Sequence, residues 1–212
     1  MLYYKTIDPE TLELLKRIQG IPEFSNLRLV GGTSLALQIG HRKSVDLDLF
    51  GKIKHDEFTI ADILNKIGQV TVLKKSENIN IYTINGIKVD IVNYPYPWLK
   101  DIILEDTLKL ANAEDIAAMK LSAITNRGTK KDFIDLFFLL KQYRLEELFD
   151  FYKNKYHDGS TFLVIKSLSY FDDADEEAMP DMCIPIKWKE VKTHISQILT
   201  DYLESNSTTS NS

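Results

Sequence analysis

The chain has 212 residues, of which 44% are hydrophobic and 27% charged, which is ordinary for one or two globular domains. No run approaches the roughly 20 apolar residues of a membrane span, the N-terminus lacks a signal-peptide core, and the single cysteine, Cys183, excludes an internal disulfide. We therefore expect a cytoplasmic protein without a membrane partner, whose net charge of −5 disfavours indiscriminate binding to nucleic acid.

Hydrophobic periodicity predicts alternating helices and strands at first, and helices later. Helices are expected over residues 8–20, 33–39 and 58–67, strands over 27–30, 45–50, 70–74, 78–84 and 87–93, and further helices from residue 112 onward. Asn85-Gly86 predicts a type I′ hairpin turn. We expect an α/β (α+β) domain over residues 1–105, a helical domain over 106–204 and a disordered polar tail over 205–212.

A glycine pair followed by two hydroxyl residues comes directly after the strand expected at 27–30. Glycine lets the backbone approach a ligand closely, and the N–H groups that open a helix attract phosphate. The residues of this turn, Gly31, Gly32, Thr33 and Ser34, are therefore candidates to hold a triphosphate. Arg42, in the basic segment that follows, is a further candidate for phosphate contact, with a solvated loop as the alternative.

Two carboxylates alternate with apolar residues in the next strand. Asp46 and Asp48 share one face, about 6.6 Å apart at Cα, so their oxygens can converge on a divalent cation. Asp90 alternates in the same way in the strand over 87–93, and it becomes a third carboxylate of the site if the two strands are neighbours. Such acids suit phosphoryl or nucleotidyl transfer, whereas a solvated strand face is the alternative.

The whole string from Gly31 to Phe50 resembles the DNA polymerase β-like nucleotidyltransferases, and within them the AbiEii/AbiGii-type toxins of bacterial toxin–antitoxin and phage-defence systems. This resemblance implies a mixed sheet flanked by helices, followed by a helical C-terminal half. It also implies Mg²⁺ or Mn²⁺ as cofactor, an NTP substrate, an RNA acceptor such as a tRNA 3′ end, and a cognate antitoxin. A third acid on a later strand is also implied, and Asp90 fits it.

A second block, Lys120 to Arg127 followed by residues 131–135, also looks like this family. The resemblance implies that Lys120, as a catalytic cation, and Arg127 face the nucleotide phosphates, with Lys131 and Asp132 completing the site and Asp132 or Asp135 orienting the cations. The alternative is a set of salt bridges that ties two helices together. Asp135 lies in an apolar helix and needs a partner, for which Lys131, four residues earlier, is a candidate.

The residues leave three functions open. The first is a metal-dependent nucleotidyltransferase toxin acting on RNA. The second is a nucleotide-binding or interaction module that has lost catalysis, and the third is a nucleotidyltransferase acting on a small molecule or a protein.

Overall fold

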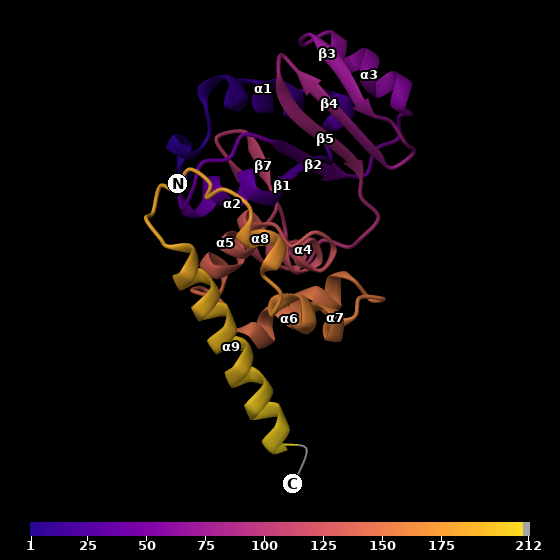
Figure 1. Ribbon diagram of the computed structural model, residues 1–212. Coiled ribbons are helices and arrows are strands. Elements are labelled where there is room, and N and C mark those ends of the chain that lie inside the picture. The colour runs from indigo at the N-terminus through magenta and orange to yellow at the C-terminus, as the bar shows by residue number, and fades with distance from the viewer. Residues whose placement is uncertain (210–212) are drawn as a thin grey trace. The chain divides into compact units, whose positions relative to one another are not determined.

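The computed structural model describes residues 1–209, and the chain divides into two compact units, Met1–Asn112 and the residues from Ala113 onward. Figure 1 shows the first unit in indigo to magenta and the second in magenta to yellow. We call them the N-terminal unit and the C-terminal unit and describe each by itself.

A mixed sheet forms the centre of the N-terminal unit. Its strands are β1 (Arg28–Val30), β2 (Leu47–Gly51), β3 (Val70–Lys74), β4 (Ile79–Ile84), β5 (Ile87–Asn93), β6 (Ile103–Glu105) and β7 (Leu108–Leu110). Among the described residues the strand order is β3-β4-β5-β2-β1-β7-β6, so β2 is an interior strand. It runs antiparallel to β1 and parallel to β5.

Helices cover this sheet. They are η1 (Tyr4–Thr6), α1 (Pro9–Gln19), η2 (Pro22–Phe24), α2 (Gly31–Ile39) and α3 (Glu57–Asn65). Helix α2 contacts β1 and β2, α1 contacts β7, and α3 contacts β3, beside which it lies in Figure 1. The predicted fold class, a mixed sheet flanked by helices, is confirmed.

The period-2 pattern of β2 and β5 sets which side chains enter the core. Leu47 and Leu49 of β2 and Val89 and Ile91 of β5 are fully buried. The residues between them therefore lie on the opposite face of the sheet. In the next turn, Asn85 and Gly86 have φ of +51° and +85°, as the predicted type I′ turn requires.

Three of the differences from the expected boundaries in this unit affect the region of the site or the extent of the sheet. Helix α2 begins at Gly31 rather than Thr33, and β2 begins at Leu47, which leaves Asp46 in the preceding loop and Val45 exposed. The hairpin of β6 and β7 was not expected, and β7 extends the sheet beyond residue 105 by pairing in parallel with β1. The sheet unit therefore continues to Asn112.

The C-terminal unit is helical, as expected. Its elements are α4 (Ala113–Asn126), α5 (Lys130–Leu139), α6 (Leu145–Lys155), α7 (Thr161–Leu168), α8 (Asp172–Asp175) and α9 (Trp188–Thr209). Helix α4 packs against α5, α6 and α7. Helix α5, whose sequence is mostly apolar, is buried at every residue except Lys131.

Helix α9 continues to Thr209, although a disordered tail was expected from Ser205. The polar side chains of the last turns bond back to the helix: Ser205 and Asn206 donate to the carbonyl of Tyr202, and Ser207 donates to that of Leu203. These bonds let a polar sequence stay helical. Residues 210–212 of the expected tail lie outside the described residues. Within residues 1–209, none of the helices has the length and apolarity that crossing a bilayer requires.

Candidate active site

Asp48 and Asp90 stand side by side on the solvent-facing side of the sheet. The parallel pairing of β2 with β5 puts the two residues directly in register. Since each lies between fully buried neighbours, both carboxylates point away from the core, and each residue is partly exposed. The two strands are therefore neighbours, as the prediction for a third carboxylate requires.

Lys88 is bound to this carboxylate pair, and the sequence reasoning missed it as a site residue. Its Nζ lies 2.9 Å from each oxygen of Asp90. Burial alone would lower the pKa of the Lys88 ammonium, but the hydrogen bond to Asp90 and the charges of Asp90, Asp48 and Asp46 raise it instead. A signal was present in the sequence, because residues two apart in a strand share a face.

The carboxylate of Asp48 also lies against the first residue of helix α2. Gly31 has φ of +67°, a left-handed conformation that β-carbons disfavour. A Cβ built on Gly31 would collide with Oδ2 of Asp48. Glycine at this position therefore lets the backbone and the Asp48 carboxylate lie close together. The carboxylate thereby lies at the N-terminus of α2, where the first N–H groups have no partners within the helix.

A pocket of about 560 Å³ opens beside this cluster. Asp46 and Lys88 line it, together with the turn at Gly86 and the first turn of α1 from Asp8 to Thr11. Its volume lies within the range of small-molecule sites. The acidic cluster of Asp46, Asp48 and Asp90 therefore lies next to a pocket that is formed by residues of the N-terminal unit.

Thr33, Ser34 and Arg42 are buried, and their contact with phosphate stays a prediction. The Thr33 hydroxyl is bonded to the Ser44 hydroxyl at 2.8 Å and donates to the carbonyl of Asp46. Arg42 donates from Nη1 to the carbonyl of Lys43 at 3.0 Å. The Thr33 and Arg42 side chains bond to the loop that carries Asp46, which is a positioning role, whereas the Ser34 hydroxyl accepts from Nε2 of Gln38 within α2.

The donor chemistry of the cluster fits a hard divalent cation. Carboxylate oxygens are the ligands that Mg²⁺ prefers, and one or two of them plus substrate phosphates suffice. In the described residues, no group of three or more His, Cys, Asp or Glu side chains is arranged so that it could itself hold a metal ion. The Asp90 carboxylate is paired with the Lys88 ammonium, so the acidic cluster favours a positive charge beside Asp90.

A second cluster, in the C-terminal unit, is centred on Asp132 at the start of α5. Its carboxylate accepts from Nζ of Lys120 at 3.0 Å, from Nε and Nη2 of Arg127 at 2.9 and 3.1 Å, and from the Thr129 hydroxyl at 2.7 Å. Asp135 lies 2.6 Å from Nζ of Lys120. The set of salt bridges between the two helices, which was the alternative interpretation, is therefore present, whereas a contact of these cations with nucleotide stays a prediction.

The electrostatics of this second cluster favour the ionised carboxylate. Burial by itself would raise the pKa of the Asp132 carboxyl, but Lys120, Arg127 and Thr129 outweigh burial and hold that pKa far below its usual range. Asp135 is fully buried, and its partner is Lys120 rather than the expected Lys131, which is exposed. The helix turns Lys131 outward while Lys120 reaches Asp135 from α4.

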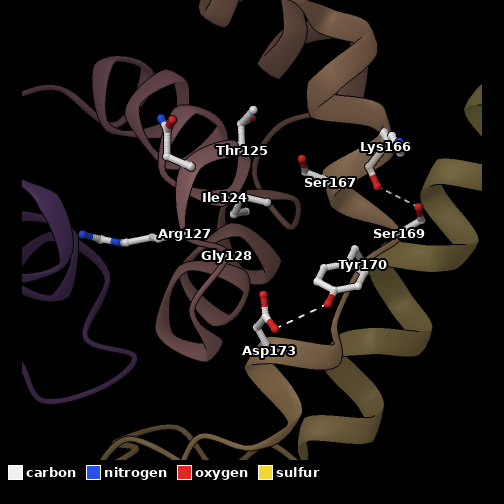
Figure 2. A pocket seen from close by; sticks show the side chains of 10 residues that line it. Ile124, Thr125, Arg127, Gly128, Lys166, Ser167, Ser169, Tyr170 and Asp173 are labelled. Atoms are coloured by element: carbon white, nitrogen blue, oxygen red, sulfur yellow. Dashed lines mark hydrogen bonds between the residues drawn. The ribbon is translucent and has the colours of Figure 1, made fainter.

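A pocket of about 410 Å³ lies at the end of α4, and Figure 2 shows the side chains that line it. Arg127 and Gly128 border it on one side, and Lys166, Tyr170 and Asp173 on the other. The Arg127 side chain is 63% exposed although it is bonded to Asp132. The Arg127 side chain is therefore bonded to the Asp132 cluster and accessible to solvent at the same time.

Comparisons with known proteins decide the family. The model of the family described as nucleotidyl transferase AbiEii toxin, type IV TA system, matches residues 13–205. The chain belongs to the AbiEii nucleotidyl transferase toxin family. The resemblance predicted from residues 31–50 is thereby confirmed. A further relative, Uncharacterized protein aq_aa25 of Aquifex aeolicus (strain VF5), is 35% identical over 206 residues, which span 94% of this chain and 99% of that protein.

Solved structures share the fold of this chain at low sequence identity. JHP933 from Helicobacter pylori is 19% identical and matches 97% of this chain and 98% of its own, with a TM-score of 0.54. MenT4, the nucleotidyltransferase toxin Rv2826c from Mycobacterium tuberculosis H37Rv, is 18% identical and matches 89% of this chain and 80% of its own, with a TM-score of 0.57. At these identities the likeness shows the fold alone.

Proposed function

We propose that this AbiEii-family protein is a metal-dependent nucleotidyltransferase toxin that transfers a nucleotide from an NTP to an RNA acceptor. The observation that carries the proposal is the in-register pair of Asp48 and Asp90 beside the glycine that opens α2. Two carboxylates and a helix N-terminus together suit a substrate that brings a divalent cation and phosphates.

Each residue of the acidic cluster has a separate role in this proposal. Asp48 and Asp46 hold the cation, and Asp90 accepts the proton of the attacking hydroxyl or completes the ligand set. A bound Mg²⁺ would stabilise the charge on the leaving oxygen. Gly31 and Gly32 let the α-helix backbone reach the triphosphate, and most of the acceleration comes from positioning and fixed charge.

The roles of the C-terminal unit are proposed from the family resemblance. Lys120 and Arg127 neutralise charge as pyrophosphate leaves, while Asp132 and Asp135 hold both cations in place through the bonds described above. Lys120 as a point charge and Arg127 as a planar fork suit phosphate oxygens. An RNA acceptor, with a tRNA 3′ end as the specific case, and a cognate antitoxin belong to the same proposal.

Label transfer tests the proposed reaction. The purified protein is incubated with Mg²⁺ and each α-³²P-labelled NTP in the presence of total tRNA, protein and small-molecule fractions, and the labelled fraction is identified. We expect label in tRNA, lost in Asp48→Asn and in EDTA. Asp62→Asn, an exposed carboxylate on α3, serves as the matched control that keeps activity.

The other outcomes separate the competing functions. Label in protein or in a small molecule alone would replace the RNA acceptor while keeping nucleotidyl transfer. Absence of Mg²⁺-dependent labelling from all four NTPs in every fraction would contradict the enzyme and favour a binding module without catalysis.

A further inference from the structure

The most informative side chain outside the proposed ligand set is Lys88. Like charges placed directly opposite on neighbouring strands destabilise a sheet, and Asp48 and Asp90 are such a pair. Lys88 lies two residues before Asp90 on the same face of β5, and its ammonium contacts both oxygens of that carboxylate. The chain therefore supplies its own cation to the acidic cluster.

We propose that Lys88 is a tethered counter-cation of the active site, which holds Asp90 in the ligand-free protein and leaves it for the nucleotide phosphates when a divalent cation and NTP bind together. This inference rests on the proposed function and adds a regulatory property to the same site. Its consequence is that metal and nucleotide bind cooperatively.

The surroundings of Lys88 allow this movement. The Lys88 side chain is 41% exposed, whereas that of Asp90 is only 18% exposed. Lys88 also lines the pocket of about 560 Å³ that Asp46 shares. Lysine carries its charge on a flexible four-carbon stem, so the ammonium can turn into this space while the strand stays in place.

Electrostatic repulsion and attraction make the cooperativity between metal and nucleotide positive. An ammonium and a divalent cation on the same carboxylate repel each other at short range, so binding of the metal alone must displace the Lys88 ammonium from Asp90 at an electrostatic cost. A triphosphate supplies the negative charge with which the displaced ammonium can pair. The site therefore favours the metal–nucleotide complex over the free metal.

Manganese binding tests the proposal without relying on turnover. Free Mn²⁺ is measured by electron paramagnetic resonance during titration of the full chain, with and without an α,β-methylene analogue of each NTP. For the unchanged protein we expect weak Mn²⁺ binding alone and about fivefold or more tightening by a nucleotide analogue. For Lys88→Met we expect tighter Mn²⁺ binding alone by a similar factor, and loss of most of the tightening by nucleotide.

Matched variants make the result specific. Lys74→Met removes an exposed lysine from strand β3 and is expected to behave like the unchanged protein. Lys88→Arg keeps the charge and is expected to keep most of the cooperativity. Circular dichroism verifies folding, and Lys88→Gln repeats the titration if the methionine variant does not fold.

The outcomes distinguish failure of this inference from failure of the proposed function. If Asp48→Asn weakens Mn²⁺ binding but the Lys88 variants bind Mn²⁺ no tighter than Lys74→Met, the metal site stands and the role of Lys88 is wrong. If Asp48→Asn leaves Mn²⁺ binding unchanged both with and without nucleotide, the metal site itself is refuted, and the role of Lys88 with it.

Discussion

At the scale of single residues, Gly31 has two separable reasons to be glycine. One is its positive φ, and the other is the closeness of the Asp48 carboxylate. Gly86 has the first property without the second, because its φ is +85° and a Cβ built there meets no atom within 4 Å. The chain thus contains an internal control that separates backbone strain from collision with the acidic cluster.

We expect Gly31→Ala to abolish most nucleotidyl transfer and to destabilise the N-terminal unit. The left-handed conformation costs about 1–2 kcal/mol for a residue with a β-carbon, and the Asp48 carboxylate must also shift to make room for the Cβ. Gly86→Ala carries the strain without the collision and is expected to lose stability by that amount while keeping far more activity than Gly31→Ala. Urea denaturation and label transfer measure the two effects, and equal activity in the two variants would contradict the argument.

Asp132 predicts a pH-dependent contribution to stability. Because the folded pKa of its carboxyl is lowered, the ionised form stabilises the fold at pH values above the unfolded pKa of about 4, and this contribution is lost as pH falls below it. We expect Asp132→Asn to lower the free energy of unfolding at pH 7 by about 1.5–3 kcal/mol, the usual range for bonds to a charged group.

The measurement is urea denaturation of both proteins between pH 3 and pH 8. The difference between them is expected to be constant above about pH 5 and to shrink toward pH 3. Asp150→Asn changes an exposed carboxylate of α6 and is expected to have little effect throughout. A difference for Asp132→Asn that does not change with pH would show that its carboxylate charge is not what stabilises α5 against α4.

At the scale of elements, α4 and α6 are joined by an ion pair that the sequence did not reveal. Nζ of Lys155 lies 2.7 Å from Oδ1 of Asp115, and both side chains are fully buried. The two residues are 40 positions apart, and each belongs to a polar segment at a helix end, so neither pattern indicates a partner. Only packing of the two helices brings them together.

We expect Asp115→Leu or Lys155→Met alone to cost about 3–5 kcal/mol, since each leaves one charge buried without its counter-ion. The double variant Asp115→Leu/Lys155→Met removes both charges and is expected to recover most of that loss. A double-mutant cycle by urea denaturation measures the coupling. Additive losses in the double variant would contradict a direct pair.

The limits of prediction are clearest in the two hairpins of the sheet. The turn at Asn85-Gly86 can be predicted from the sequence, because asparagine and glycine take positive φ more readily than other residues. The turn between β6 and β7 uses Asp106 and Thr107 at φ of +50° and +70°, although a β-branched residue is unusual there. No local signal marks this hairpin, and tertiary contacts such as the Tyr4 hydroxyl on Asp106 accompany it instead.

The residues of the candidate site differ in the same way in how far local sequence determines their placement. Local alternation sufficed to place Asp48 and Asp90 on the outward face of their strands, and the strand pairing then brought them together. The burial of Thr33, Ser34 and Arg42 depends on how the loop after α2 folds back, which no local pattern encodes. Lys88 was overlooked because a lysine on an outward strand face is ordinary, and only its proximity to Asp90 gives it a role.

At the scale of the whole molecule, the division of the chain at Asn112 follows from hydrogen bonds that end just before it. The side chain of Gln19 on α1 bonds to the carbonyl and the N–H of Lys109 at 2.8 and 2.9 Å. The N–H of Ala111 donates to the carbonyl of Leu29 on β1, and Gln38 of α2 donates to the carbonyl of Ala111. Residues 108–111 thus bond to three elements that precede them.

We therefore expect a fragment of residues 1–112 to fold and a fragment of residues 1–105 to fail. The shorter fragment lacks β7, so it leaves β1 as an open sheet edge and removes Leu108 and Leu110, both fully buried, from the core. Circular dichroism and the dispersion of amide signals in NMR spectra measure the outcome. Cooperative unfolding of the 1–105 fragment would contradict the argument, since it would show that the sheet is complete without the strand at its β1 edge.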